Sequence, residues 1–316
     1  MWVGDRMLAV QTITGPVAAV AGSFTLFRLV QLRPIYSGLS VRWTLFWWLL
    51  SASFVLLVGL AGLIPELVSP AAKSILHYLL AVLMMTPAVS TLGARRHGLQ
   101  AWQLFVVIPL ILVLIWPVAA ELFFSRDLRP LLLSGPAQAG YLAVLLMSAG
   151  PGLGGALTIA CLMRLAASLV LLAPAAAWTA TQQDLLPCAA LLLLAEAEMT
   201  LRQLRGRTSA VDCATNLRQQ TAAVWLLFQD LYGPVWAQRF MNRMAQFERA
   251  ERWSCSLQRS GFVGLNEQPL QDVDLARPLE SFRWVISRFA ESEWLERHLP
   301  FVAAGTSSDS PDAPPC

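Results

Sequence analysis

Several apolar stretches of about twenty residues constrain the fold of this chain more than any other feature. A helix rises 1.5 Å per residue and the hydrocarbon core of a bilayer is about 30 Å thick, so about 20 apolar residues suffice for one crossing. A helix also satisfies its own backbone hydrogen bonds, which lipid cannot do. The clearest candidates for transmembrane helices are 43–65, 74–93 and 102–123.

The apolar region 136–178 is too long for one crossing and predicts two further spans. The helix-breaking cluster Gly150–Gly155 (GPGLGG) divides it into 137–152 and 156–176. We interpret this cluster as a break between spans, and a re-entrant turn that lines a cavity is the alternative. A sixth and shorter span is predicted at 185–200.

Residues 1–42 predict an N-terminal helix associated with the membrane. Segment 7–30 is apolar enough to enter a bilayer, but it also resembles a signal peptide, with Arg6 before an apolar stretch that ends in Ala19-Val20-Ala21. Cleavage there would send the arginines that precede residue 43 to the outer face. That outcome conflicts with the charge pattern described below, so we favour an uncleaved helix.

Charged residues divide the chain into two parts. The first 196 residues contain 16 charged residues, whereas the last 120 contain 27. Overall only 14% of the residues are charged, compared with about 25% in soluble domains. The block 43–200 is therefore predicted to be solvated by lipid and 201–302 by water. The tail is close to neutral, so it lacks the excess of basic residues that a nucleic-acid-binding surface requires.

Basic residues between the spans predict the orientation. Positive charges favour the cytoplasmic side of short loops. They precede the first strong span, separate the second from the third, and follow the sixth, namely Arg28, Arg33, Arg42, Arg95, Arg96, His97, Arg202, Arg205 and Arg207. Six alternating crossings place all of these on one face. We therefore expect both ends of the block in the cytoplasm of a bacterial plasma membrane.

The C-terminal part predicts a small, mainly helical domain. Apolar residues recur every three or four positions in 210–232, 234–251 and 278–299, which indicates three helices. Gly233 ends the first of these and Pro234 opens the second.

Alternation of Trp253, Cys255 and Leu257 with polar residues, followed by the turn signal Ser260-Gly261, allows at most one short β-hairpin. Residues 303–316 are small, polar and proline-rich and predict disorder. The expected fold class is thus an all-α membrane protein of about six transmembrane helices followed by a small cytoplasmic domain.

Arg164 is the most informative candidate site residue. It lies inside an apolar span, where an arginine costs at least about 2.5–3.5 kcal/mol and tends to be paired or to line a polar cavity. Under that interpretation Glu121 or Glu196 is its partner, at a substrate or proton pathway. The alternative is that the span begins later and Arg164 extends to the cytoplasmic interface. The carboxylates of Glu121 and Glu196 also fit ordinary span ends.

Asp230-Leu231-Tyr232-Gly233-Pro234-Val235-Trp236 is the densest aromatic stretch of the tail. A packed corner between two helices is the favoured interpretation. The alternative is a partner-binding patch that comprises Tyr232, Trp236, Arg239 and Arg243.

No cofactor or catalytic motif is present in the sequence. The three histidines, His77, His97 and His298, lack the spacing of a haem or metal site, and the five cysteines form no C-x-x-C pair. The glycine cluster at 150–155 lacks the Lys-Ser/Thr of a phosphate-binding loop. No serine lies in a G-x-S-x-G elbow. The sequence therefore favours a protein that is not an enzyme and binds no cofactor.

Two segments carry a resemblance to known proteins. Residues 92–98 (LGARRHG), followed by Ala101-Trp102 and an apolar span, and residues 231–243 (LYGPVWAQRFMNR) resemble a family of uncharacterised bacterial multi-pass membrane proteins. The resemblance implies a hydrophobic block before a tail with an aromatic corner and a basic helix. It implies no activity.

Two functions follow as hypotheses. The first is a structural or interaction subunit of the plasma membrane, whose C-terminal domain contacts a protein partner or whose spans or C-terminal domain form a homo-oligomer. The second is a small transporter or membrane enzyme with a polar cavity around Arg164.

Overall fold

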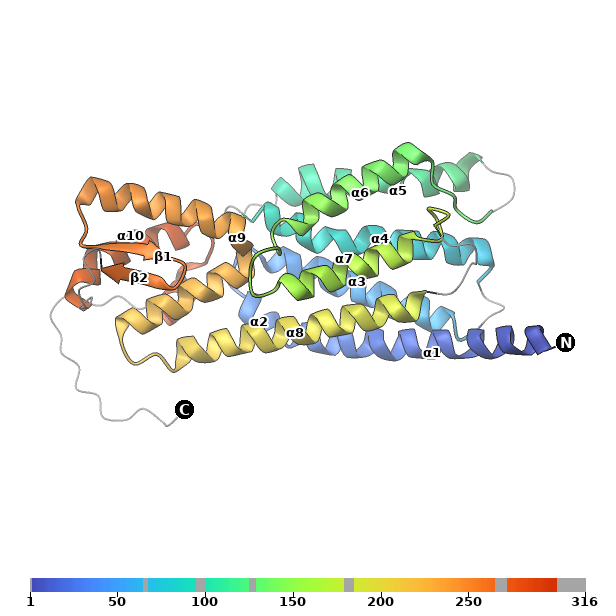
Figure 1. Cartoon of the computed structure of the whole chain (residues 1–316), viewed down its shortest axis with the longest axis horizontal. Helices are drawn as coiled ribbons and strands as arrows, with labels where there is room; N and C mark the ends of the chain where they lie inside the picture. The colour runs from blue at the N-terminus through green and yellow to red at the C-terminus, as the bar shows by residue number, and fades with distance from the viewer. Residues whose placement is uncertain are drawn as a thin grey trace.

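The computed structural model describes residues 2–64, 68–94, 101–124, 129–178, 185–264 and 272–299, with side chains from residue 14 onward. The chain is mainly helical, and its helices form a long bundle and a smaller C-terminal group at one end of it (Figure 1). The bundle contains α1 (Trp2–Val30), α2 (Arg33–Tyr36), α3 (Arg42–Ala61), α4 (Pro70–Leu92), the π-helical turn η2 (Gln103–Val107), α5 (Ile108–Phe124), α6 (Gly135–Ala149), α7 (Thr158–Leu172) and the first part of α8 (Leu186–Asp212).

In the C-terminal group, called the C-terminal domain from here on, two further helices and a hairpin pack against one long helix. It contains α9 (Leu217–Glu251), β1 (Cys255–Gln258), β2 (Gly261–Gly264), η3 (Asp272–Leu275), α10 (Ala276–Ile286) and α11 (Ser292–His298). The predicted tail 303–316 and the basic positions 95–97 lie outside the described residues.

Three helical segments of the described chain are long and apolar enough to cross a membrane: α3, α4 and the segment η2–α5. They coincide with the predicted spans 43–65, 74–93 and 102–123. The other predicted spans differ in length. α6 and α7 have 15 residues each, or about 22 Å, which is shorter than the hydrocarbon core. α8 starts where the sixth span was predicted but continues to Asp212, through the expected boundary at residue 200.

Small residues bring α1 and α3 into close contact, side by side (Figure 1). A Cβ atom added to Gly59 would lie 2.6 Å from the backbone nitrogen of Ala19, and one added to Gly15 would lie 2.8 Å from the carbonyl carbon of Gly62. Backbones approach this closely only where side chains are small, as in many membrane helix pairs. Ala18 and Ala21, at the cleavage site that the signal-peptide alternative would use, are buried in this contact region.

The helix predicted at 210–232 begins later than expected. Asn216 caps α9, because its side-chain oxygen accepts a hydrogen bond from the backbone N–H of Gln219 at 2.8 Å. Residues 210–212 instead complete α8. The predicted break at Gly233 is present as a kink, since Gly233 has φ +78° and ψ 174° and the chain continues as a helix from Pro234.

The helix predicted at 278–299 is divided into α10 and α11, because another part of the chain uses its backbone groups. The N–H of Ser40 donates to the carbonyl of Phe289 at 2.7 Å, and the N–H of Glu291 donates to the carbonyl of Gly38 at 2.8 Å. Leu39 and Ala290 form an isolated antiparallel bridge between these bonds. The connection between α2 and α3 therefore belongs to the C-terminal domain as much as to the bundle.

The short hairpin is confirmed. β1 and β2 pair antiparallel, with Cys255 opposite Gly264 and Gln258 opposite Gly261. Gly261 has φ +123°, a conformation that side chains rarely adopt, so glycine is required at this turn. The indole N–H of Trp225 in α9 donates to the carbonyl of Gln258 at 2.8 Å and holds the hairpin against the helix.

One hydrophobic core joins the two parts of the molecule. Leu29 at the end of α1, Leu32 just after it and Trp48 of α3 belong to the same buried cluster as Trp225 and Phe282 of the C-terminal domain. A second cluster fills the rest of the bundle around Tyr78 and Tyr141. The C-terminal domain is therefore packed on the bundle through apolar contacts.

We expect Gly59→Ala to destabilise the bundle, because the added methyl group overlaps the backbone of α1, and such overpacking costs about 1–3 kcal/mol. Gly140→Ala in α6 is the matched control, since a Cβ atom there meets nothing within 4 Å. Thermal unfolding in detergent should show a lower midpoint for the first variant only. Equal midpoints for the two variants would contradict the close α1–α3 contact.

Candidate functional site

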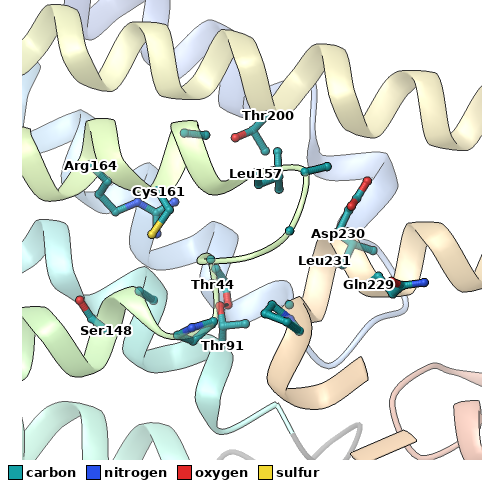
Figure 2. A pocket seen from close by; sticks show the side chains of 18 of the residues that line it. Thr44, Thr91, Ser148, Leu157, Cys161, Arg164, Thr200, Gln229, Asp230 and Leu231 are labelled. Carbon is teal, nitrogen blue, oxygen red and sulfur yellow. Dashed lines mark hydrogen bonds between the residues drawn. The ribbon is translucent and has the colours of Figure 1, made fainter. Parts of the chain in front are cut away.

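A cavity of about 80 Å³ lies where the bundle meets the C-terminal domain. Figure 2 shows Arg164 and Cys161 of α7 on one side and Gln229, Asp230 and Leu231 of α9 on the other. The bundle helices and the loop before α7 complete the wall, with Tyr36, Thr44, Trp48, Thr91, Ser148, Pro151, Gly152, Leu157 and Thr200. The space is large enough for a few water molecules and its lining includes several polar groups.

Arg164 and Glu196 form a buried ion pair between α7 and α8. Both Nε and Nη2 of Arg164 contact Oε1 of Glu196. The Glu196 side chain is 0% exposed and that of Arg164 is 17% exposed. The guanidinium carbon of Arg164 also lies 4.7 Å from the ring centroid of Trp48, a cation–π contact. Of the two partners that the sequence allowed for Arg164, the structure brings Glu196 to it.

Two buried polar atoms near this pair have no hydrogen-bond partner among the described residues: Oε2 of Glu196 and Nε1 of Trp48. Buried polar groups are normally paired with protein or with water. Of the two residues, Trp48 lines the cavity, whereas Glu196 is connected to it through Arg164. The wall of the cavity therefore offers a donor to water or a small polar solute.

Tyr36 lies on the cavity wall from the short helix α2. Burial raises the pKa of its phenol to about 12, and the positive charge of Arg164 acts against this rise. The phenol therefore stays neutral over the physiological pH range. It adds a hydroxyl group, without charge, to the cavity wall.

The glycine cluster at 150–155 closes the cavity on the side of the C-terminal domain. A Cβ atom added to Gly233 would lie 1.8 Å from the carbonyl oxygen of Pro151, so only glycine permits this approach. The hydroxyl of Thr158 donates to the carbonyl of Gly155 at 2.7 Å and orders the loop before α7. The cluster separates α6 from α7, as expected for a break between spans, and also contacts the kink of α9.

Further ion pairs connect α8 to its other neighbours. Glu198 pairs with Arg28 of α1 at 2.8 Å, and Arg207 pairs with Asp230 of α9 at the same distance. The amide of Gln203 also donates to Asp230 at 2.9 Å. α8 thus holds polar contacts to α7, α1 and α9 along one continuous helix.

The third candidate carboxylate, Glu121, does not join this site. It lies near the end of α5, where its Oε1 accepts a hydrogen bond from the backbone N–H of Arg129 at 3.4 Å. This contact is exposed and local in the chain. Glu121 therefore sits at an ordinary helix end.

The aromatic residues of the predicted partner patch are inside the domain. Tyr232 is 1% exposed; its hydroxyl donates to the carbonyl of Phe289 and lies 3.0 Å from the hydroxyl of Ser40. Burial raises the pKa of its phenol far above the ordinary value, and the hydrogen bond with Ser40 opposes that rise. Trp236 is 8% exposed. These two rings form a packed corner, whereas Arg239 and Arg243 remain on the surface.

The site contains no recognisable catalytic set. Within the described part of the chain, no three His, Cys, Asp or Glu side chains gather as a metal site would require. Cys161 is a free, partly buried thiol on the cavity wall. The arrangement can hold water or a small polar solute beside a buried ion pair.

We expect Arg164→Leu and Glu196→Leu to lower the unfolding temperature strongly, because each leaves a buried charge without its partner, which costs about 3–5 kcal/mol. The double variant R164L/E196L should recover most of this loss, since apolar residues can replace a buried pair at little cost. Arg129→Leu, at an exposed position, is the control. Thermal unfolding in detergent measures all four, and single variants as stable as the native chain would exclude a structural role for the pair.

No protein-family model, curated protein or solved structure matches this chain.

Proposed function

We propose that this chain is a membrane-anchored interaction subunit of the bacterial plasma membrane, related to the multi-pass family that its two segments resemble. α3, α4, η2–α5, α6, α7 and the first half of α8 form six spans, and α1 packs beside them without being cleaved. The short helices α6 and α7 cross with the help of the apolar residues that flank them. The C-terminal domain lies in the cytoplasm and contacts a protein partner.

The observation that carries this proposal is the attachment of the C-terminal domain to the bundle. The shared core around Leu32, Trp48 and Trp225 and the backbone bonds of Ser40 and Glu291 hold the domain in one orientation. A domain that is fixed in this way presents the same surface toward the cytoplasm at all times. Fixed presentation suits a subunit that positions a partner relative to the membrane, because less orientational freedom is lost on binding.

A tagged full-length chain purified from its native membrane in mild detergent tests this function. We expect a partner, either another protein or a second copy of the chain, to stay in a fixed stoichiometric ratio through size-exclusion chromatography. An unrelated membrane protein with the same tag serves as the control for detergent artefacts. Recovery of monomer alone would count against the interaction role.

A second function, a small transporter or membrane enzyme, is favoured by the cavity beside Arg164. Residues of both the bundle and the C-terminal domain line the cavity, and one of them, Trp48, has an indole N–H with no hydrogen-bond partner among the described residues. A pathway for a small polar solute or a proton requires a polar space within the helices.

The native thiol of Cys161 reports on this second function, because it lines the cavity. We expect a small cationic methanethiosulfonate reagent to modify Cys161 in a chain whose other cysteines are replaced by serine. A variant that also carries Cys161→Ser is the control. A thiol that remains unmodified in the folded protein would show that cationic solutes of this size do not enter, and would count against this candidate.

A further inference from the structure

An exposed tryptophan on the C-terminal domain makes cation–π contacts with two arginines. Trp284 of α10 is 46% exposed. The guanidinium carbon of Arg288 lies 4.2 Å from the centroid of its ring, and that of Arg243 in α9 lies 5.7 Å from it. Two segments far apart in the sequence thus place two cations on one indole. We name Arg239, Arg243, Trp284 and Arg288 the cationic cluster.

The cluster extends along the exposed face of α9. Arg239 lies one turn before Arg243, on the same side of the helix, and its guanidinium carbon is 4.9 Å from the Trp236 ring. Arg243 also lies 4.8 Å from the Phe247 ring and donates to Oε1 of Gln246 at 2.7 Å. Cation–π contacts of this kind hold the long arginine side chains in place before a partner arrives.

Among the described residues, no ion pair involves an arginine of the cluster. The ion pairs among the described residues involve other arginines, at positions 28, 42, 164, 202, 207 and 297. Arg239, Arg243 and Arg288 are all exposed. A guanidinium group binds carboxylates through two parallel hydrogen bonds and is less strongly hydrated than an ammonium group. Arginine and tryptophan also dominate the energetically important positions of protein interfaces.

The position of the cluster favours a protein over a lipid surface. After Gly233, α9 runs away from the bundle along the long axis of the molecule (Figure 1). Arg243 is ten residues beyond Gly233, which corresponds to about 15 Å at 1.5 Å per residue. The headgroup layer extends only about 5–8 Å beyond the hydrocarbon core on each side. Gly233 meets Pro151 in the loop at the end of the bundle. With that loop at the edge of the hydrocarbon core, Arg243 would lie beyond the headgroups.

We infer that the cationic cluster binds an acidic segment of a partner protein. Aspartate or glutamate carboxylates of that segment pair with Arg239, Arg243 and Arg288, and an apolar side chain next to them covers the indole of Trp284. This inference rests on the proposed interaction function and adds the chemistry of the partner segment to it.

Fluorescence anisotropy with the full-length protein in detergent tests the inference. The probe is a labelled twelve-residue peptide of Glu, Gly and Ser with one central Leu, and its twin has Gln at every Glu position. We expect the acidic peptide to bind at least ten-fold more tightly than its twin. The double variant R243E/R288E should lose at least ten-fold in affinity for the acidic peptide.

The control variant R218E/R259E makes the same change in net charge at two exposed positions elsewhere in the domain. Its affinity should stay within two-fold of the native protein. Equal losses in the two double variants, equal binding of the two peptides, or no binding of either would overturn the inference. The same holds if vesicles containing phosphatidylserine bind through Arg243 and Arg288 while the acidic peptide does not.

Co-purification of the R243E/R288E variant separates this inference from the proposed function. Loss of the partner from R243E/R288E, together with its retention by R218E/R259E, supports both the inference and the proposed function. A partner that stays with both variants leaves the interaction function standing and rejects the cluster as its site. Absence of any partner from the native chain rejects the proposed function itself.

Discussion

The charged residues of α8 connect the parts of this molecule. Glu196 meets Arg164 inside the bundle, Glu198 meets Arg28 of α1, and Arg207 meets Asp230 of α9. The pairs differ in what they contribute. Exposed pairs are worth about 0–1 kcal/mol, and a buried pair yields little net stability compared with apolar residues, although losing one partner is costly. The buried pair therefore favours the observed packing of α7 against α8 over other packings. Any packing that separates Arg164 from Glu196 leaves a buried charge without a partner.

Much of the architecture follows from residues that act locally. Length and apolar composition predicted α3, α4 and η2–α5, and Gly233-Pro234 and Ser260-Gly261 predicted the kink of α9 and the hairpin. The predictions of helix ends that were wrong have one cause in common, namely contacts with segments far away in the sequence. The helix expected at 278–299 is interrupted because Ser40 and Gly38, about 250 residues earlier, bond to its backbone. α8 continues past residue 200 because neighbouring helices supply partners for its charges. Neither effect leaves a periodic signal in the sequence.

The sequence predicted a polar environment around Arg164, but it did not predict which residues surround it. An arginine within an apolar span indicates a polar environment from its cost alone, and two carboxylates were available as partners. The choice of Glu196 over Glu121 depends on which helices are neighbours, which span prediction does not define. The wall residues Trp48 and Tyr36 gave no signal, since a tryptophan near a span end and a tyrosine between helices are ordinary features of membrane proteins. Tyr232 and Trp236 likewise needed the structure, because a dense aromatic segment suits a core and an interface equally well.

The hydrogen bonds between the connection at 38–40 and residues 289–291 have a consequence for biosynthesis. When the ribosome has produced α3, the carbonyl of Phe289 and the N–H of Glu291 do not yet exist, so Gly38, Leu39 and Ser40 must wait for nearly the whole chain. During that interval the apolar side chains of Leu32, Tyr36 and Val41 lack the surface that later covers them. Closing a loop of this length is entropically costly, and its hydrogen bonds cannot form before residues 289–291 have been synthesised. Residues 201–302 expressed alone would similarly lack the bridge partner Leu39 and the apolar residues that complete their core.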